Sequence, residues 1–319
     1  MFRYLYTVLS SSNPNLFFLK LTIIVGILLL GVIAYNITTP PYERKAEAFT
    51  QSEQFVMKHN EEMYDDFYAD IYDVLHDTKK RGQKELIEVV RLTDPSVKHS
   101  SFLDIGSGTG HLVGELDEAG YAVYGIDKSK SMIDYADKKY PDAEFIHGDA
   151  LDTMHFEKYT FTHVLCNYFT IYQFEEKDKF FKNCRHWLKP NGYLILHLVD
   201  TEKFTRILPK TNSIIQPIEK KRNGKRIIDS VETFEDYQCN ARCEIPTSSQ
   251  HDTVALYSET LIDSETKHVR QNEQAMYMDS AENILETARK NGFIFHGKVN
   301  MEKCNGDKNQ FLYILERPM

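Results

Sequence analysis

The pattern of apolar and polar positions divides most of this chain into four successive parts. Residues 16–35 are apolar almost throughout, with Lys20 as their one charge. Residues 64–75 repeat apolar side chains at helical spacing. Residues 101–200 alternate short apolar strands with helical stretches, whereas residues 201–279 lack that alternation and indicate strands of mixed polarity. The pattern predicts an anchor, a helical lid, an α/β core and a β-rich insertion.

The first apolar stretch, LFFLKLTIIVGILLLGVIAY at residues 16–35, predicts a transmembrane helix. A helix of twenty residues rises about 30 Å, the thickness of a bilayer core. Lys20 lies about one turn in and can reach the interface. A buried core helix is rarely apolar on every side, and a cleaved signal peptide would need a small-x-small site, which is not evident after Ala34. We therefore expect residues 1–40 to form a permanent anchor.

Residues 41–100 are expected to form a linker and a helical lid. Residues 42–60 are typical of a polar, partly helical linker, and Asn60-Glu61-Glu62 of an N-cap with an acidic first turn. A second helix is expected over residues 83–92. The first helix places three tyrosines on its apolar stripe: Tyr64, Tyr68 and Tyr72. This helix either packs on the core or closes over a ligand, and a ligand can partner buried hydroxyls.

The α/β core opens on SFLDIGSGTG, in which a short strand runs into a turn with three glycines. These are Gly106, Gly108 and Gly110. Such a turn brings backbone close to a nucleotide-like ligand, because glycine permits positive φ and has no Cβ to obstruct the ligand. The spacing is D-x-G-x-G-x-G, with Asp104 on the strand, whereas dinucleotide folds use G-x-G-x-x-G.

The following strands end in side chains that suit a nucleoside. The second strand ends at Asp127, whose carboxylate can accept hydrogen bonds from both ribose hydroxyls. The third ends in Gly148-Asp149-Ala150, where the carboxylate can receive an adenine amino group. The fourth ends at Asn167. Strand–helix units at this spacing predict a parallel, doubly wound sheet with its ligand at the carboxyl ends of the strands.

The rest of the chain predicts antiparallel structure. Residues 201–279 are expected to be antiparallel strands inserted after the fifth core strand. Residues 220–226 form a basic run around an Asn-Gly hairpin turn, which is either a solvated tip or a contact for anionic lipid headgroups. Two closing strands at residues 293–299 and 310–315, joined by a polar turn at residues 302–308, predict an antiparallel final pair.

Charge and cysteine content exclude some partners. The net charge is −9, but residues 1–48 carry +2, which leaves −11 on the other 271 residues. This balance argues against a duplex nucleic-acid partner. Five scattered cysteines are an odd number and favour reduced, cytosol-facing thiols over a disulfide framework. Cys239 and Cys243 lack a second ligand pair at a suitable spacing, so we expect no metal site.

In order and spacing, the segments LDIGSGTG, YGIDKSKSM, FIHGDA, a fourth strand ending in asparagine, and WLKPNGYLILHL resemble class I S-adenosylmethionine (SAM) dependent methyltransferases over residues 101–200. The resemblance implies a Rossmann-like doubly wound α/β sheet with an antiparallel last strand, and SAM as the cofactor. It implies that the glycines admit the methionine part of SAM. Asp127 would bind the ribose, Met132 would pack against the adenine, and Asp149 would bind the adenine amino group.

Asp104 and Asn167 would lie near the methionine amine or the glycine turn. The full set of cofactor-binding residues that we infer is Tyr72, Asp104, Gly106, Ser107, Gly108, Gly110, Asp127, Lys128, Met132, Asp149, Ala150 and Asn167.

The acceptor is expected to be a small or lipid-associated molecule, methylated at nitrogen or oxygen. The fourth strand ends Asn-Tyr-Phe-Thr, not the Asn-Pro-Pro-Tyr of adenine N6 methyltransferases. The lid helix YDDFYADIYD instead resembles small-molecule N-methyltransferases that act on sugar amines or glycine. Candidate bases at the strand tips are Tyr168, Tyr172, His197 and Asp200, and none is singled out. His197 lies in an apolar strand, which is more typical of a core histidine.

Two other functions remain open. A nucleotide-cofactor oxidoreductase is disfavoured by the glycine spacing and the closing hairpin. A catalytically inactive, membrane-tethered scaffold is disfavoured because the glycines and both ligand carboxylates are intact. We expect a single-pass membrane protein with residues 101–319 as its SAM-binding domain. Its catalytic body is expected in the cytosol, because SAM is made there and the cysteines show no pairing pattern.

Overall fold

The computed structural model describes residue 20 and residues 51–208, 217–247 and 253–319. The chain divides into two units, residues 1–48 and residues 49–319, and all that follows concerns the second. Among the described residues no helix is long and apolar enough to span a bilayer. The predicted span lies outside the described residues apart from Lys20, so the anchor stays a prediction.

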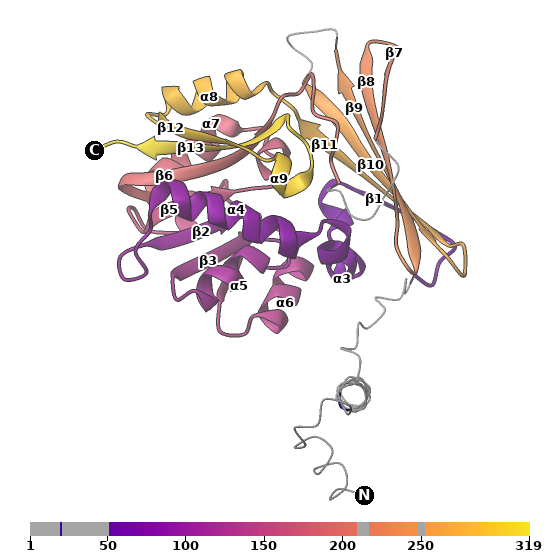
Figure 1. The fold of residues 1–319 in the computed structure, drawn as a ribbon, viewed down its shortest axis with the longest axis horizontal. Coiled ribbons are helices and arrows are strands. Elements are labelled where there is room, and N and C mark those ends of the chain that lie inside the picture. The colour runs from indigo at the N-terminus through magenta and orange to yellow at the C-terminus, as the bar shows by residue number, and fades with distance from the viewer. Residues whose placement is uncertain (1–19, 21–50, 209–216, 248–252) are drawn as a thin grey trace, which may run out of the picture. The chain divides into compact units, whose positions relative to one another are not determined.

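A seven-stranded sheet forms the centre of the second unit, in the order β12-β13-β6-β5-β2-β3-β4 (Figure 1). Five strands are mutually parallel: β2 (Ser101–Ile105), β3 (Ala122–Asp127), β4 (Glu144–His147), β5 (Phe161–Cys166) and β6 (Leu188–Val199). β13 (Gln310–Arg317) runs antiparallel to both β6 and β12 (Ile294–Asn300). The predicted doubly wound sheet and its antiparallel closing pair are confirmed.

Helices cover both faces of this sheet. On one face α4 (Thr78–Thr93), α5 (His111–Glu118) and α9 (Glu302–Asn305) pack over one apolar core. On the other lie α6 (Lys130–Lys139), α7 (Lys177–Trp187) and α8 (Ala281–Lys290), whose larger core extends to the second sheet. Short 3₁₀ helices η3 (Thr153–His155) and η4 (Thr170–Gln173) follow β4 and β5. Since both faces are covered, most residues of the central strands β2 and β5 are buried.

A second, six-stranded sheet has the order β1-β11-β10-β9-β8-β7. Its inserted strands are β7 (Ile218–Arg222), β8 (Lys225–Thr233), β9 (Tyr237–Pro246), β10 (Val254–Asp263) and β11 (Val269–Tyr277). Neighbouring strands among these five are antiparallel, as predicted. In β8 to β11, buried residues occur at alternate positions, so one face of this sheet packs on the rest of the unit.

The predicted linker contains a strand that the sequence pattern does not indicate. β1 (Phe55–His59) pairs in parallel with β11 at the edge of the second sheet, with Phe55 opposite Val269. The prediction of a partly helical linker at residues 42–60 is therefore wrong at its end. The partner strand lies more than 200 positions away, so no local pattern of the surrounding polar residues reports the pairing.

The lid helix begins later than predicted. A 3₁₀ turn, η2 (Asn60–Met63), precedes α3 (Asp66–Leu75), whose N-cap is Asp65. The Asp65 carboxylate accepts a hydrogen bond from the Tyr68 N–H at 3.2 Å. Asn60 does not cap the helix, because its side-chain oxygen accepts from the Ala275 N–H of β11 at 3.0 Å. The next helix, α4, also starts earlier than the predicted residue 83.

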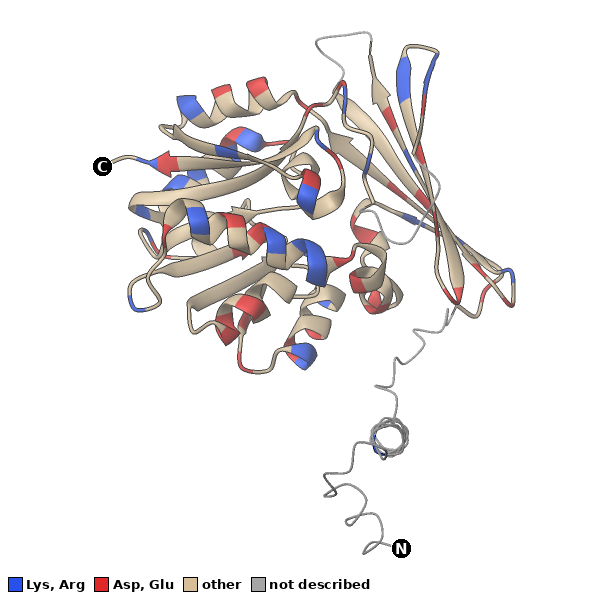
Figure 2. Cartoon of the chain, in the orientation of Figure 1, with Lys and Arg blue, Asp and Glu red and all other residues tan. Residues whose placement is uncertain are grey.

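The basic run at residues 220–226 forms the predicted hairpin. Asn223 and Gly224 both have positive φ, 51° and 70°, which a two-residue turn of this twist requires. Figure 2 colours the lysine and arginine positions of β7 and of the start of β8 blue. Arg226 does not fit the interpretation of this run as a solvated tip. Its side chain is buried and donates to Glu219 at 2.7 Å and to the Phe204 carbonyl.

The predicted polar turn at residues 302–308 is partly buried. Asp307 lies in the interior, where its Oδ2 accepts from the N–H groups of Thr205 at 2.6 Å and Arg206 at 3.0 Å. This carboxylate fixes the segment that follows β6 against the loop before β13. Buried backbone donors need such partners, which explains why polar residues occupy an interior position here.

We predict that Asp307→Ala lowers the free energy of unfolding by about 2–6 kcal/mol, because it leaves the backbone N–H groups of Thr205 and Arg206 without their acceptor at about 1–3 kcal/mol each. Chemical denaturation of residues 49–319 measures this loss. Lys308→Ala, at the exposed neighbouring position, is the matched control. Equal stability of the two variants would show that Asp307 is dispensable.

Candidate active site

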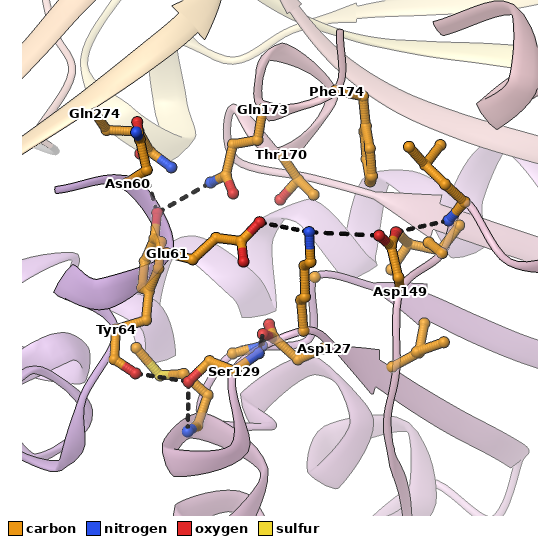
Figure 3. Close-up of a pocket in the computed structure, with 18 of the residues that line it drawn as sticks. Asn60, Glu61, Tyr64, Asp127, Ser129, Asp149, Thr170, Gln173, Phe174 and Gln274 are labelled. Atoms are coloured by element: carbon orange, nitrogen blue, oxygen red, sulfur yellow. Dashed lines mark hydrogen bonds and ion pairs between the residues drawn. The ribbon is translucent and has the colours of Figure 1, made fainter. Parts of the chain in front are cut away.

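A cavity of about 470 Å³ lies between the carboxyl ends of the main-sheet strands and the second sheet. The glycine turn after β2 and the tips of β3 and β4 line one side. Residues of η2, α3 and η4 form the walls, and Gln274 of β11 lies opposite, as Figure 3 shows. Carboxyl ends of parallel strands are where doubly wound sheets bind ligands. The cavity therefore lies where the sequence predicts the ligand.

The glycine turn is bent tightly against its surroundings. Gly106 and Gly108 have φ of 69° and 54°, a region that L-residues with a side chain rarely adopt. A Cβ on Gly106 would lie 2.6 Å from Thr170 Cγ2 of η4. The Gly108 N–H donates to Asp127 Oδ2 at 2.9 Å. The turn thus leaves its backbone exposed to the cavity and joins β2 to the tip of β3.

Asp127 is held with its carboxylate toward the cavity. Besides the Gly108 bond, its Oδ1 accepts from the Ser129 N–H at 2.8 Å. Burial raises the pKa of Asp127, and the two backbone hydrogen bonds oppose that rise. An ionised carboxylate offers about four acceptor positions. Asp127 therefore retains capacity for hydroxyl donors of a ligand.

Lys128 joins the lid to the tip of β4. Its ammonium contacts the Glu61 carboxylate of η2 and lies 3.4 Å from Asp149 Oδ2 (Figure 3). The hydrogen bond to Glu61 is the main reason that the pKa of Lys128 is raised. Asp149 Oδ1 also accepts from the Leu151 N–H at 2.8 Å. The Asp149 carboxylate is thereby fixed at the cavity rim.

The charges that line the cavity are mostly negative. Among the described lining residues, one ammonium, that of Lys128, faces five carboxylates: Glu61, Asp127, Asp149, Glu175 and Glu176. Apolar lining comes from Ile126, Met132, Ala150, Leu151 and Phe174. A concave site lined by one sign of charge attracts the opposite charge. The lining thus favours a cationic ligand with an apolar part.

Comparison with known proteins identifies the core. Residues 103–196 match the family described as the methyltransferase domain. The SAM-bound structure of CalS10, an amino pentose methyltransferase from Micromonospora echinaspora, has the same fold, with a TM-score of 0.52 and 15% identity over 74% of this chain and 91% of that one. This chain contains a SAM-dependent methyltransferase domain.

Other similar proteins also carry methyltransferase names. The CcbJ methyltransferase structure from Streptomyces caelestis has a TM-score of 0.62 and 14% identity, over 82% of this chain and 100% of that one. Demethylmenaquinone methyltransferase of Thermotoga maritima is 30% identical over 160 residues, 46% of this chain and 66% of that protein. An N,N-dimethyltransferase of dTDP-3-amino-3,6-dideoxy-alpha-D-glucopyranose from Streptomyces fradiae is 34% identical over 88 residues, 26% of this chain and 34% of that protein. The chain spans between a third and two thirds of the length of these curated relatives.

The cofactor of the methyltransferase domain is SAM, and the cavity fits it. At Gly108 the nearest atom to an added Cβ is Tyr72 Cε1 at 3.7 Å, so the bare backbone there leaves room for the methionine part, whereas the space at Gly106 is taken by Thr170. Asp127 and Asp149, on adjacent strand tips, offer acceptors for ribose hydroxyls and for an adenine amino group. The Met132 side chain lies among the apolar lining residues, where a purine ring can pack.

Eight of the predicted cofactor-binding residues line the cavity of the methyltransferase domain: Tyr72, Gly106, Gly108, Asp127, Lys128, Met132, Asp149 and Ala150. The remaining four, Asp104, Ser107, Gly110 and Asn167, are not among its lining residues. Burial raises the pKa of Asp104 to about 8. Gly110 serves packing, since a Cβ there would lie 2.6 Å from Phe145 Cζ. The individual binding roles of these residues stay predictions.

Three lining residues meet across the cavity, and of these the sequence singles out only Tyr64, as part of the tyrosine stripe of the lid. The Tyr64 hydroxyl donates to Gln274 Oε1 at 3.1 Å and accepts from Gln173 Nε2 at 3.0 Å. They come from the segment between η2 and α3, from β11 and from η4. In the sequence, the tyrosine stripe of the lid indicates Tyr64, and the alternating polarity of residues 268–278 indicates Gln274. No pattern indicates Gln173. Their meeting depends on the docking of the second sheet.

The structure separates the predicted strand-tip bases. Of the four, only Tyr168 lines the cavity, and burial raises its pKa well above the usual range. His197 is a core histidine, as predicted: its Nδ1 accepts from the Phe169 N–H at 3.2 Å, its Nε2 pairs with Gln310 at 3.0 Å, and burial lowers its pKa to about 3. The Tyr172 hydroxyl accepts from the Val199 N–H at 2.9 Å. Tyr168, Tyr172 and His197 are therefore not poised to remove a proton at neutral pH.

We predict that Asp127→Ala weakens SAM binding by roughly 1.5–3 kcal/mol, or about ten- to a hundredfold in Kd, the scale of hydrogen bonds to a charged acceptor. Isothermal titration measures the affinity, and circular dichroism checks the fold. Asp134→Asn, which alters an exposed carboxylate paired with Lys130 on α6, should bind SAM as the unchanged protein does. Undiminished affinity of Asp127→Ala would remove this residue from the site.

Proposed function

We propose that this protein transfers the methyl group of SAM to a nitrogen atom of a small, amine-bearing acceptor. The observation that carries the proposal is the acidic end of the cavity. Glu175 and Glu176 precede α7, and Glu61 lies on η2, so carboxylates from two segments face the space beside the cofactor residues. An ammonium or amine is stabilised there, whereas an anionic acceptor such as a phosphate ester is repelled.

The ionisation of the lining residues supports nitrogen as the acceptor atom. Burial raises the pKa values of the cavity tyrosines Tyr64, Tyr72 and Tyr168, so none of them is a base at neutral pH. No histidine is among the described lining residues. An alcohol would need a base to remove its proton during transfer. A neutral amine already presents a lone pair.

The residues of the chain then have three tasks. SAM, when bound, supplies a methyl group on a positively charged sulfur. The walls formed by Tyr64, Thr170 and Gln274 orient the acceptor and exclude water. Glu175 and Glu176 attract the protonated amine, which loses its proton to solvent before its neutral form reacts. The new N–C bond forms as the S–C bond breaks, which leaves S-adenosylhomocysteine.

The relatives support both this proposal and a second candidate. An amino-sugar dimethyltransferase and an amino pentose methyltransferase are among the similar proteins. Demethylmenaquinone methyltransferases are too, and a lipid-associated quinone is the second candidate because residues 16–35 predict a membrane span. The acidic lining favours the amine over the uncharged quinone.

We predict that the double variant Glu175→Gln/Glu176→Gln raises KM for an amine acceptor about tenfold, since both carboxylates are exposed and an ion contact at an exposed position is worth at most about 1 kcal/mol. SAM affinity should not change. The assay measures transfer of labelled methyl from SAM to amino sugars, with the matched hydroxy sugars and demethylmenaquinone as competing acceptors. kcat/KM should rise with pH toward the pKa of the amine, because the neutral form reacts.

The control is Glu282→Gln, an exposed carboxylate on α8 outside the cavity lining. Methyl transfer to demethylmenaquinone alone would replace the amine proposal with the second candidate. Transfer to amines with an unchanged KM in the double variant would remove Glu175 and Glu176 from acceptor binding.

We further propose that residues 16–35 anchor the protein in a membrane with residues 49–319 in the cytosol. The apolar length of the segment supports the anchor. All five cysteines are buried free thiols, as a reducing compartment allows. SAM is made in the cytosol, so this orientation needs no imported cofactor.

We predict that the full chain stays with membranes during carbonate extraction, and that a chain starting at Pro41 is released yet still binds SAM. Protease treatment of sealed vesicles tests the orientation. Digestion of the catalytic unit without detergent is expected, while its survival until detergent is added would place it on the opposite side. Extraction of the full chain by carbonate would refute the anchor.

A further inference from the structure

Behind the cavity wall, a continuous series of hydrogen bonds runs from β10 of the second sheet through α3 to Ile207, in the segment that follows β6. The Tyr68 hydroxyl lies 2.8 Å from Glu259 Oε1 of β10 and 3.1 Å from His76 Nε2. His76 Nδ1 lies 3.1 Å from the Tyr168 hydroxyl, which lies 2.6 Å from the Ile207 carbonyl oxygen. Tyr68, His76 and Glu259 are buried. Tyr168, the last side chain of this series, lines the cavity.

Counting protons shows that this series of four hydrogen bonds needs one more proton than neutral side chains supply. Each hydrogen bond contains one proton. Tyr68, Tyr168 and a neutral His76 contribute one each, and the Ile207 carbonyl contributes none. An ionised Glu259 adds none, so one of the four contacts would then join two acceptors. The fourth proton belongs either to the Glu259 carboxyl or, as a second proton, to His76.

The surroundings of His76 disfavour a second proton there. Burial and the Arg81 guanidinium both lower the pKa of His76, to about 3. Arg81 is close, since its Nε donates to the His76 carbonyl at 3.4 Å. The ring also packs on Tyr72, at 4.3 Å between centroids. An imidazolium in this position would face a like charge without water.

The surroundings of Glu259 favour a proton on its carboxyl. The side chain is fully buried, and burial raises its pKa. Tyr257 donates to this carboxyl at 2.5 Å and Asn272 at 3.3 Å, and these hydrogen bonds oppose the rise without outweighing burial. The Arg270 guanidinium opposes the rise, but it donates to Asp65 at 2.9 Å and to the Met63 carbonyl.

The remaining titratable groups near Glu259 do not stabilise its charge. The Cys239 thiol of β9 has a pKa raised well above its usual range, first by burial and then by Glu259 and Glu232. Burial likewise raises the pKa of Tyr64 and Tyr72, so both are neutral. Among these groups, Arg270 is therefore the cation that faces Glu259. Arg270 also forms a salt bridge with Asp65.

We propose that Glu259 is a protonated positioning residue, whose proton sets the direction of the whole series and fixes Tyr168 in the cavity wall. Glu259 donates to Tyr68, and Tyr68 donates to His76 Nε2. His76 Nδ1–H donates to Tyr168, and Tyr168 donates to the Ile207 carbonyl. All four contacts are then hydrogen bonds. The Tyr168 hydroxyl is held by two partners, with the Arg81 guanidinium 3.8 Å from its ring centroid.

The proposal has a defined dependence on pH. A buried carboxyl whose pKa is raised above its ordinary 4.5 stabilises the fold in its protonated form. That contribution is complete below the unfolded pKa and is lost as the pH rises through the folded pKa. A glutamine at this position has the shape of the protonated acid and donates through Nε2 at every pH. The melting temperature of Glu259→Gln relative to the unchanged protein should therefore rise with pH.

The decisive experiment compares Glu259→Gln with Glu259→Ala in the full chain. Glu259→Gln should keep its Tm at pH 7 within about 2 °C, whereas Glu259→Ala should lose more than about 5 °C because Tyr68, Tyr257 and Asn272 lose their partner. Infrared spectra at pH 7 should show a neutral carboxyl band that disappears in Glu259→Gln. Asp104 also has a raised pKa, so Asp104→Asn identifies its own contribution to that band.

Kinetics supply the functional readout, which rests on the proposed methyl transfer. Glu259→Gln should retain kcat/KM within about threefold, and Glu259→Ala, where it folds, should lose it through KM. The infrared and melting measurements need no turnover, so they decide the protonation even if the acceptor is not an amine. A Glu259→Gln protein as unstable as Glu259→Ala, or one with an unchanged carboxyl band, would overturn the proposal.

Discussion

The hydrogen bond from the Gly108 N–H to the Asp127 carboxylate is the contact on which the rest of the site depends. It forms only because the turn after β2 adopts positive φ, which brings backbone amides to the tip of the neighbouring strand. The bond orients the carboxylate toward the cavity and leaves the turn without side chains on the ligand side. The other cofactor-binding residues that we infer and that line the cavity lie around this turn and the neighbouring strand tips. A side chain at Gly106 would collide with Thr170, so the same corner also fixes the start of η4.

The second sheet completes the site by polar rather than apolar contact. Its buried face holds Glu259, Arg270 and Asn272 among apolar neighbours. Each of these groups is bonded to a residue of the lid or to another of the three. Buried polar groups are costly when unpaired. These hydrogen bonds therefore favour a single position of the lid on this sheet, because any other position would leave Glu259 or Arg270 without a partner in the lid. The position of the lid also fixes one wall of the cavity, because Tyr64 belongs to the lid, Gln274 belongs to the second sheet, and the two side chains are hydrogen-bonded.

The elements that could be predicted from the sequence are those determined by residues close together along the chain. The strands from β2 to β6 follow from short apolar runs between turn residues, and Asp127 and Asp149 follow from strand ends. The hairpin at Asn223 follows from turn chemistry. Elements whose partners are distant were missed or misplaced. β1 pairs with β11, and Asn60 bonds β11 instead of capping the lid helix. The same distance explains why the contact of Tyr64 with Gln173 and Gln274 was not predicted, because these side chains meet only after the second sheet has docked.

The pairing of the lid with the second sheet has a consequence for biosynthesis. Tyr64 and its partner Gln274 are 210 positions apart. At the usual 5–20 residues per second, a ribosome needs about 10–40 s to make the intervening chain. The glycine turn and strand tips emerge during this interval and can assemble, while the lid and β1 have no surface to pair with. During this interval β1 has no partner strand, because β11 has not yet been made. An unpaired strand edge of this kind is a substrate for chaperones.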